Sequence, residues 1–182
     1  GHRSLLHLLH PHERNLLRDL KEAGYYTACF GKNDALVPAA VPLALDEWKP
    51  RFSPRDKPRF LTPPEPKWEA GFYKGKREPS PCHDGDSAFV DSALDLLDHP
   101  PKEPFCIFLP LHFAHPSYTV EEPWFSLHNR SAVHPPYPPQ FEGKDPYYRI
   151  YFERSGLAEL TEEDRREIRA VYWGMISRVD HL

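Results

Sequence analysis

Apolar residues in the first part of the chain change from helical to strand spacing. They recur every three or four positions over residues 11–23, which predicts a helix, and Gly24 stands where a C-terminal cap belongs. The aromatic and β-branched run 25–30 then predicts a short strand, which Gly31 ends. This stretch therefore predicts a helix that is followed directly by a strand.

The same order of elements returns further along the chain. An amphipathic pattern predicts a second helix over about residues 84–99. After a Pro-Pro turn, the strand expected over residues 105–111 is apolar without alternation, which is typical of a strand covered by helices on both faces. A last helix is expected to begin at Thr161, where Thr161 and Asp164 form the acidic variant of a capping box.

The last helix carries an apolar stripe that reaches the end of the sequence. The stripe consists of Ile168, Val171, Tyr172, Met175, Ile176, Val179 and Leu182. No glycine or proline follows it, whereas helix ends usually carry a stop signal. We therefore expect the sequence to be cut inside a helix and to be an internal piece of a longer chain.

The order of elements predicts an α/β fold. Helix, strand, long loop, helix, strand, long loop and helix follow one another, which is typical of a mostly parallel sheet with helices on its faces. In such sheets, binding sites lie at the carboxyl ends of the strands. The chain is long enough for one domain, residues 1–182, with a substantial core.

Composition narrows the classes of partner. The formal net charge is −4, and no basic field is present, so no nucleic-acid partner is expected. No apolar run approaches the roughly 20 residues that cross a bilayer, so no membrane span is expected. The 22 prolines crowd into residues 37–81 and 116–146, which we expect to be long proline-rich loops.

Candidate chemistry is found where the two expected strands end. Lys32 follows the first strand in the sequence GKND, and His112 and His115 follow the second in LHFAHP. A lysine in such a place can hold an anion, and a histidine can transfer a proton or pair with an oxyanion. A solvated loop lysine and hydrogen-bonded structural histidines are the alternatives. Because the carboxyl ends of parallel strands meet at one edge of a sheet, we expect an anion-facing edge there.

The residues alone indicate neither a nucleophile nor a metal site. The sequence contains no GxSxG, GxxxxGK[ST] or GxGxxG motif, and no carboxylates spaced for a divalent metal. Cys29, Cys82 and Cys106 form no CxxC pair, and Cys29 and Cys106 are expected to be buried as small apolar residues. The residues alone thus indicate an α/β protein with an anion-facing edge.

Four segments, taken in order, resemble the type I sulfatases of the alkaline phosphatase-like superfamily. NLLRDLKEAGYYTACFGKND is similar to the family's helix–strand–GK segment, and PFCIFLPLHFAHPSYTVEEPW is similar to its "PFFLFVSFHDPHPPF..P" segment. YWGMISRVDHL resembles the segment before the last metal-binding strand, and GHRS resembles the end of the segment after the nucleophile motif. The resemblance implies a partial three-layer sandwich with a mostly parallel sheet.

The resemblance also implies a reaction, the hydrolysis of sulfate esters by a sulfuric ester hydrolase. Such enzymes use a formylglycine, made from Cys or Ser in a C/S-x-P-x-R motif, and a calcium ion that stabilises the sulfate oxygens. By position in the family's motifs, Lys32 and His115 would be catalytic residues that contact the sulfate, and His115 would protonate the leaving oxygen. His112 and Asp34 would contribute to substrate binding.

The sequence departs from the family's pattern in several places. Asp34 stands where the family often has a histidine that helps the aldehyde to hydrate, and Ala114 replaces the usual proline before His115. No C/S-x-P-x-R motif occurs in the 182 residues, and no metal ligand is assigned among them. We expect the nucleophile motif upstream of Gly1 and the closing metal pair downstream of Leu182, so that the chain alone is inactive.

Two other functions remain open. A phosphodiesterase or phosphonate hydrolase of the same superfamily would share the scaffold. A degenerate, non-catalytic sulfatase-like domain would bind a partner or an anionic glycan through its loops. For a sulfatase, the expected substrate is a small-molecule or glycan sulfate ester, and the expected location, by analogy with the family, is the periplasm, the outside of the cell or the lysosome.

Overall fold

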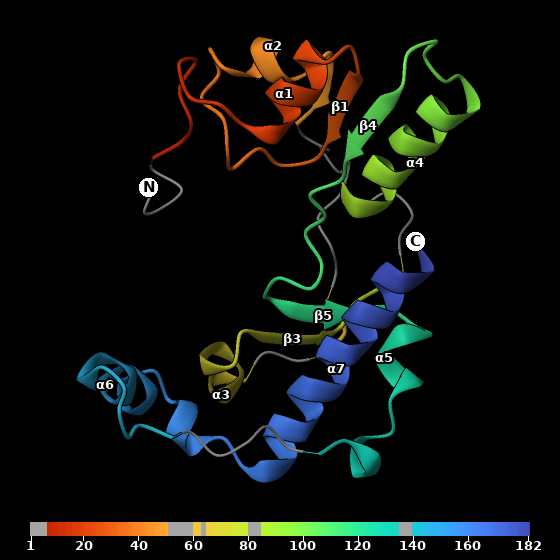
Figure 1. The fold of residues 1–182 in the computed structure, drawn as a ribbon. Coiled ribbons are helices and arrows are strands. Elements are labelled where there is room, and N and C mark those ends of the chain that lie inside the picture. The colour runs from red at the N-terminus through yellow and green to blue at the C-terminus, as the bar shows by residue number, and fades with distance from the viewer. Residues whose placement is uncertain (1–6, 51–59, 63–64, 80–84, 135–139) are drawn as a thin grey trace. The chain divides into compact units, whose positions relative to one another are not determined.

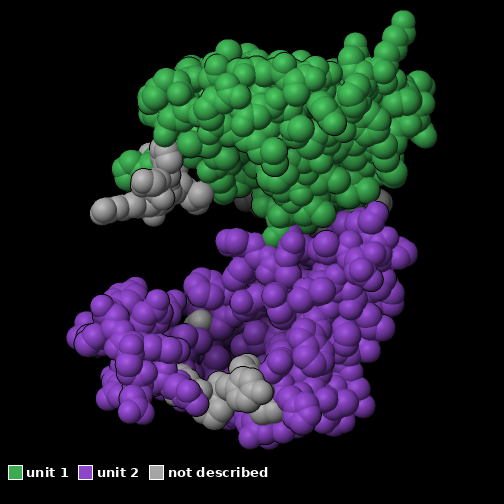
Figure 2. All heavy atoms as spheres, viewed as in Figure 1, with its two compact units in different colours: residues 1–56, 81–112 green, residues 57–80, 113–182 purple. Residues whose placement is uncertain are grey.

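The computed structural model describes residues 7–50, 60–62, 65–79, 85–134 and 140–182. They belong to two compact units, which Figure 2 colours separately. Unit 1 comprises Gly1–Asp56 and Pro81–His112, and unit 2 comprises Lys57–Ser80 and Phe113–Leu182. Each unit combines helices with parallel strands, which confirms the expected α/β class (Figure 1). One domain over residues 1–182 stays a prediction.

Unit 1 is built on three parallel strands. The strands are β1 (Tyr26–Phe30), β2 (Glu47–Lys49) and β4 (Phe105–Phe108), in the order β2–β1–β4. The helices of this unit are α1 (Leu16–Glu22), α2 (Val41–Ala44) and α4 (Gly85–Asp98). Cys29 of β1 is in register with Trp48 of β2 and with Phe108 of β4. The three strands therefore end together at one edge of the sheet, which we call the carboxyl edge.

The central strand β1 is covered on both faces. Ala28 and Phe30 are fully buried in a cluster with Phe89 of α4, whereas Cys29 packs on the other side with Leu17 of α1 and Ala44 of α2. This division follows from the strand's alternation of side chains between its two faces. Burial raises the pKa of the Cys29 thiol to about 11, so Cys29 is a buried apolar residue, as expected.

The second strand is shorter and more exposed than its sequence predicts. β4 ends at Phe108, and Phe105 and Phe108 are 37% and 46% exposed. Ile107, by contrast, packs against the cluster around Ala28 and Phe30. In the part of the chain that the structure describes, β4 pairs with β1 alone and is an edge strand. The prediction that both faces are covered is therefore wrong for this strand, because an apolar run does not distinguish an edge strand from a central one.

Unit 2 is built around a long helix that lies against a pair of parallel strands. β3 (Tyr73–Lys76) pairs with β5 (Tyr118–Val120), and α7 (Glu162–His181) packs on both (Figure 1). The shorter helices are α3 (Pro66–Ala70), α5 (Trp124–Leu127), η1 (Arg130–Ala132), α6 (Pro146–Arg154) and η2 (Leu157–Glu159). The core consists of the buried residues Tyr73, Val120, Val171 and Met175.

The proline-rich regions contain regular structure where long loops are expected. Residues 37–81 hold α2, β2, α3 and β3, and residues 116–146 hold β5, α5 and η1. Prolines lie in the first turns of α2, α3 and α6. Their fixed φ suits a helix start, and the missing N–H would have no partner within the helix there. The prediction of long loops is therefore wrong at these short helices and strands.

The start of the last helix is confirmed. The Asp164 amide donates to the Thr161 hydroxyl at 3.1 Å, and the Thr161 amide donates to the Asp164 carboxylate at 3.0 Å, which completes the capping box. Lys67 of α3 also pairs with Asp164 at 2.9 Å. Of the apolar stripe on α7, Val171 is fully buried and Ile176 is exposed, so the stripe is covered along one side.

Truncation of the core of unit 2 tests this account of α7. Met175 has no exposed surface, so Met175→Ala is expected to lower the free energy of unfolding by about 2–4 kcal/mol through lost contacts and a cavity. Ile176 is 44% exposed, so the control Ile176→Ala is expected to cost less than about 1 kcal/mol. Urea unfolding followed by circular dichroism measures both values. Equal losses would contradict the placement of the buried side of α7.

Candidate functional site

The turn after β1 is shaped by the side chain of Asn33. Its carboxamide oxygen accepts hydrogen bonds from the amides of Ala35 at 3.0 Å and Leu36 at 2.8 Å. Its nitrogen donates to the Leu36 carbonyl oxygen at 2.7 Å. Such local bonds let an asparagine replace backbone contacts in a tight turn. Lys32 and Asp34, on either side of Asn33, are therefore presented by a fixed turn.

Gly31 brings the chain after β1 against the chain after β4. Its φ is 144°, and a Cβ at this position would lie 2.7 Å from Pro110 Cγ and 2.8 Å from the Pro110 carbonyl oxygen. Only glycine tolerates both the backbone conformation and this approach. Trp48 of β2 donates its indole N–H to the Gly31 carbonyl oxygen at 3.2 Å. The segments that lead to Lys32 and to His112 are thus in contact at the carboxyl edge.

Lys32 and Asp34 form an ion pair at the carboxyl edge. Lys32 Nζ lies 2.9 Å from Asp34 Oδ2, and the two side chains are 57% and 41% exposed. A pair this open to water contributes at most about 1 kcal/mol. Asp34 therefore orients the ammonium group only weakly, and an incoming anion can compete with Asp34 for it. The role of Asp34 in substrate binding stays a prediction.

His112 is attached to a buried carboxylate of α4. Its amide donates to Asp86 Oδ1 at 2.7 Å, and its ring Nδ1 lies 3.4 Å from the same oxygen. The Asp86 side chain is 1% exposed, whereas the His112 side chain is 55% exposed. Asp86 thus fixes the backbone at His112 and leaves the ring open to a ligand. Sequence reasoning missed Asp86, because it lies 26 positions before His112 in the chain.

His115 lies in unit 2, outside the unit that carries Lys32, Asp34 and His112. It is exposed, and its ring Nδ1 donates to the Pro116 carbonyl oxygen at 2.5 Å. In a neutral ring this leaves Nε2 as the nitrogen that accepts a proton or meets a ligand. That His115 joins the other three residues in one site stays a prediction.

A buried ion-pair network anchors the segment that carries His115. Glu121 accepts hydrogen bonds from Arg77 Nε at 2.7 Å and from Arg178 Nε at 2.6 Å. The two guanidinium carbons lie 5.0 and 4.9 Å from the ring centre of Phe113, two residues before His115. Burial raises the pKa of Glu121, but the hydrogen bonds from both arginines outweigh it and hold the pKa below its ordinary value. The segment is therefore fixed on both sides of the histidine.

A second, partly buried network ties α7 to η1 and β3. Arg130 donates to the two carboxylate oxygens of Glu167 at 2.8 and 3.0 Å, and the Tyr73 hydroxyl donates to Glu167 at 2.6 Å. Burial raises the pKa of the Tyr73 hydroxyl far above its ordinary value. For Glu167, burial raises the pKa, but the bonds from Arg130 and Tyr73 lower it overall. Sequence reasoning missed both networks, because their members lie in separate elements.

The residues present do not fit a calcium ion. Within the described ranges, no group of three or more His, Cys, Asp or Glu side chains is arranged to hold a metal. The C/S-x-P-x-R motif from which a formylglycine is made is also absent from the 182 residues. The candidate site at the carboxyl edge therefore consists of Lys32, Asp34 and His112.

Comparison with known proteins assigns no family. No family model matches the chain, and no curated protein matches it with significance. In the described part of the chain, no helix has both the length and the apolarity to cross a membrane. The class that the fold and the site define is an α/β protein with Lys32 and His112 at the ends of adjacent parallel strands.

Acid is expected to destabilise unit 2 through Glu121 and Glu167. Both carboxyl groups have a lowered pKa in the folded state. Their contribution to stability is therefore complete above the ordinary carboxyl pKa of about 4.3 and is lost as the pH falls through the folded-state values. Urea unfolding between neutral pH and about pH 3 measures this loss.

Glu121→Gln isolates one of the two carboxyl groups. At neutral pH this variant is expected to lose about 3 kcal/mol of stability, because two buried arginines keep their charge without a carboxylate between them. It is also expected to lose less stability in acid than the unaltered chain. Glu153→Gln, at an exposed position on α6, serves as the control and is expected to match the unaltered chain. Equal acid sensitivity of Glu121→Gln and the unaltered chain would contradict the role of Glu121.

Proposed function

We propose that this chain is part of a sulfatase, a sulfuric ester hydrolase with an alkaline phosphatase-like fold. The observation that supports this function best is the position of Lys32 and His112 at the ends of β1 and β4, two neighbouring parallel strands. Open α/β sheets bind ligands at this edge. The contact of Gly31 with Pro110 brings together the two segments that carry these residues.

Each of the four predicted site residues has a proposed role in sulfate ester hydrolysis. Lys32 supplies a positive charge to the sulfate oxygens, and Asp34 orients its ammonium group through their 2.9 Å contact. His112 binds the substrate from a backbone that the buried Asp86 fixes. His115 contacts the sulfate and protonates the leaving oxygen. Charges fixed in advance around a developing anion are usually the largest contribution to such catalysis.

The substrate in this proposal is a small-molecule or glycan sulfate ester, met in the periplasm, outside the cell or in the lysosome. The proposal also includes a formylglycine, which would be the nucleophile. It includes a calcium ion, which would balance the charge of the sulfate. Neither fits the residues described, so both are assigned to parts of the protein beyond these 182 residues.

The coding sequence around this segment tests the reaction class. For a sulfatase, a C/S-x-P-x-R motif is expected before Gly1, and an Asp-His or Asp-Asn pair is expected after Leu182. A threonine in place of the Cys or Ser would favour phosphodiester or phosphonate hydrolysis on the same scaffold. A coding sequence without either motif would contradict catalysis and favour a non-catalytic, sulfatase-like binding domain.

Turnover by the longer protein tests Lys32. Lys32→Ala removes a positive charge and is expected to lower kcat/KM for a sulfate ester by about a hundredfold. Removal of one oxyanion-stabilising donor lowers the rate of other enzymes on this scale. Lys102→Ala is the matched control, because Lys102 is exposed and precedes β4 at the opposite end of the strand. The 182-residue chain alone is expected to show no turnover above its own Lys32→Ala variant. Equal activities of the two lysine variants would contradict the role of Lys32.

A further inference from the structure

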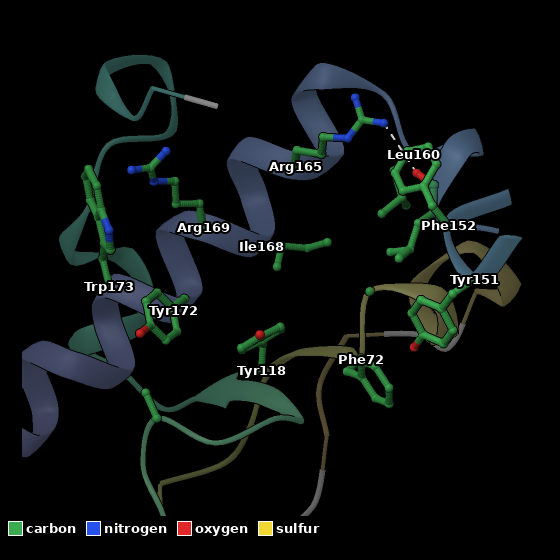
Figure 3. A pocket seen from close by; sticks show the side chains of 13 residues that line it. Phe72, Tyr118, Tyr151, Phe152, Leu160, Arg165, Ile168, Arg169, Tyr172 and Trp173 are labelled. Atoms are coloured by element: carbon green, nitrogen blue, oxygen red, sulfur yellow. Dashed lines mark hydrogen bonds between the residues drawn. The ribbon is translucent and has the colours of Figure 1, made fainter. Parts of the chain in front are cut away.

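Unit 2 contains a cavity that plays no part in the proposed hydrolysis. Its volume is about 850 Å³, which lies in the range of pockets that hold small molecules. Figure 3 shows it from close by. Six aromatic side chains line it: Phe72, Tyr118, Tyr151, Phe152, Tyr172 and Trp173. Such a lining offers flat apolar surfaces and three phenol groups to a ligand.

Several elements of unit 2 form the walls, among them α7, α6 and β5. α7 presents Ile168 and Tyr172, which lie four positions apart and therefore on one helix face. Ile168 points from α7 toward Phe152 of α6 in Figure 3. Tyr118, at the start of β5, meets Tyr172 edge to face, with their ring centres 5.8 Å apart. The walls thus belong to elements that pack on one another within the unit.

The charge of the lining is entirely positive. Its charged residues are Arg165 and Arg169, and none of its residues is acidic. Arg165 is half-buried, and its Nη2 donates to the Leu157 carbonyl oxygen at 3.3 Å. Among the described residues no carboxylate pairs with it, whereas the next residue, Arg166, pairs with Glu162. The guanidinium group of Arg169 lies 5.2 Å from the ring centre of Trp173.

We infer that this cavity binds an aromatic carboxylate. The aromatic ring of the ligand packs between the aromatic walls, and its carboxylate pairs with Arg165. The planar guanidinium group matches a carboxylate with two parallel hydrogen bonds, and a half-buried site strengthens them. A neutral aromatic molecule would pack between the same walls but would not form the ion pair with Arg165. This inference concerns residues of unit 2 and stands whether or not the proposed sulfatase function is correct.

Calorimetric titration of the unaltered 182-residue chain tests the inference with two probes of one shape. 2-Naphthoate carries the ring and the carboxylate, and naphthalene-2-carboxamide carries the same ring without charge. We expect one naphthoate to bind per chain. The carboxamide is expected to bind at least about tenfold more weakly, because it lacks the hydrogen-bonded charge pair. Equal affinities of the two probes, or no binding of naphthoate at millimolar concentration, would overturn the inference.

Matched variants locate the two parts of the ligand. Arg165→Gln is expected to reduce naphthoate affinity to that of the carboxamide, and Arg166→Gln to leave it unchanged. Phe152→Ala removes part of a wall and is expected to weaken both probes alike. Circular dichroism is used to check that each variant keeps its fold. Unchanged naphthoate binding in Arg165→Gln, or an equal loss in Arg166→Gln, would assign the binding to another place and overturn the inference.

Discussion

The carboxyl edge of unit 1 depends on the close approach of Gly31 to Pro110. A side chain at position 31 would overlap the proline ring and its carbonyl oxygen, so the two strand ends meet only because glycine is there. The strand before Gly31 is packed between helices on both faces, which leaves its end little freedom. The buried Asp86 fixes the other side by accepting the amide hydrogen of His112. Backbone constraints thus position Lys32 and His112, while both side chains remain exposed.

Unit 2 uses its arginines in two different ways. Glu121 pairs with Arg77 and Arg178, and Glu167 pairs with Arg130. In each pair the arginine is distant in sequence from its glutamate. These pairs fix the register of α7 against its neighbours. The pairs of Glu121 are buried, so breaking one of them would leave an uncompensated charge. Arg165, by contrast, faces an aromatic cavity and has no carboxylate partner among the described residues. The guanidinium group of Arg165 is therefore available to pair with a ligand.

Local patterns in the sequence predicted those elements whose causes are local. The capping box at Thr161, the strand β1 and the helix α4 follow from neighbouring residues, and the structure has all three. The exposure of β4 and the short helices in the proline-rich regions depend on what packs nearby, which spacing alone does not encode. The contact of Asp86 with His112, and the boundary between the two units after His112, are likewise set by tertiary packing. His112 and His115 are three positions apart in the sequence, yet the two belong to different units.

In the proposed function, the ends of β1 and β4 act as one anion-binding edge. Nuclear magnetic resonance titration of the chain with sodium sulfate, against sodium chloride at equal ionic strength, tests it most directly. For one shared site, we expect the amide signals of Lys32 and His112 to move together with a single dissociation constant, while the amide signal of Lys102 does not move. Signals of Lys32 and His112 that move independently, or no further than that of Lys102, would contradict it.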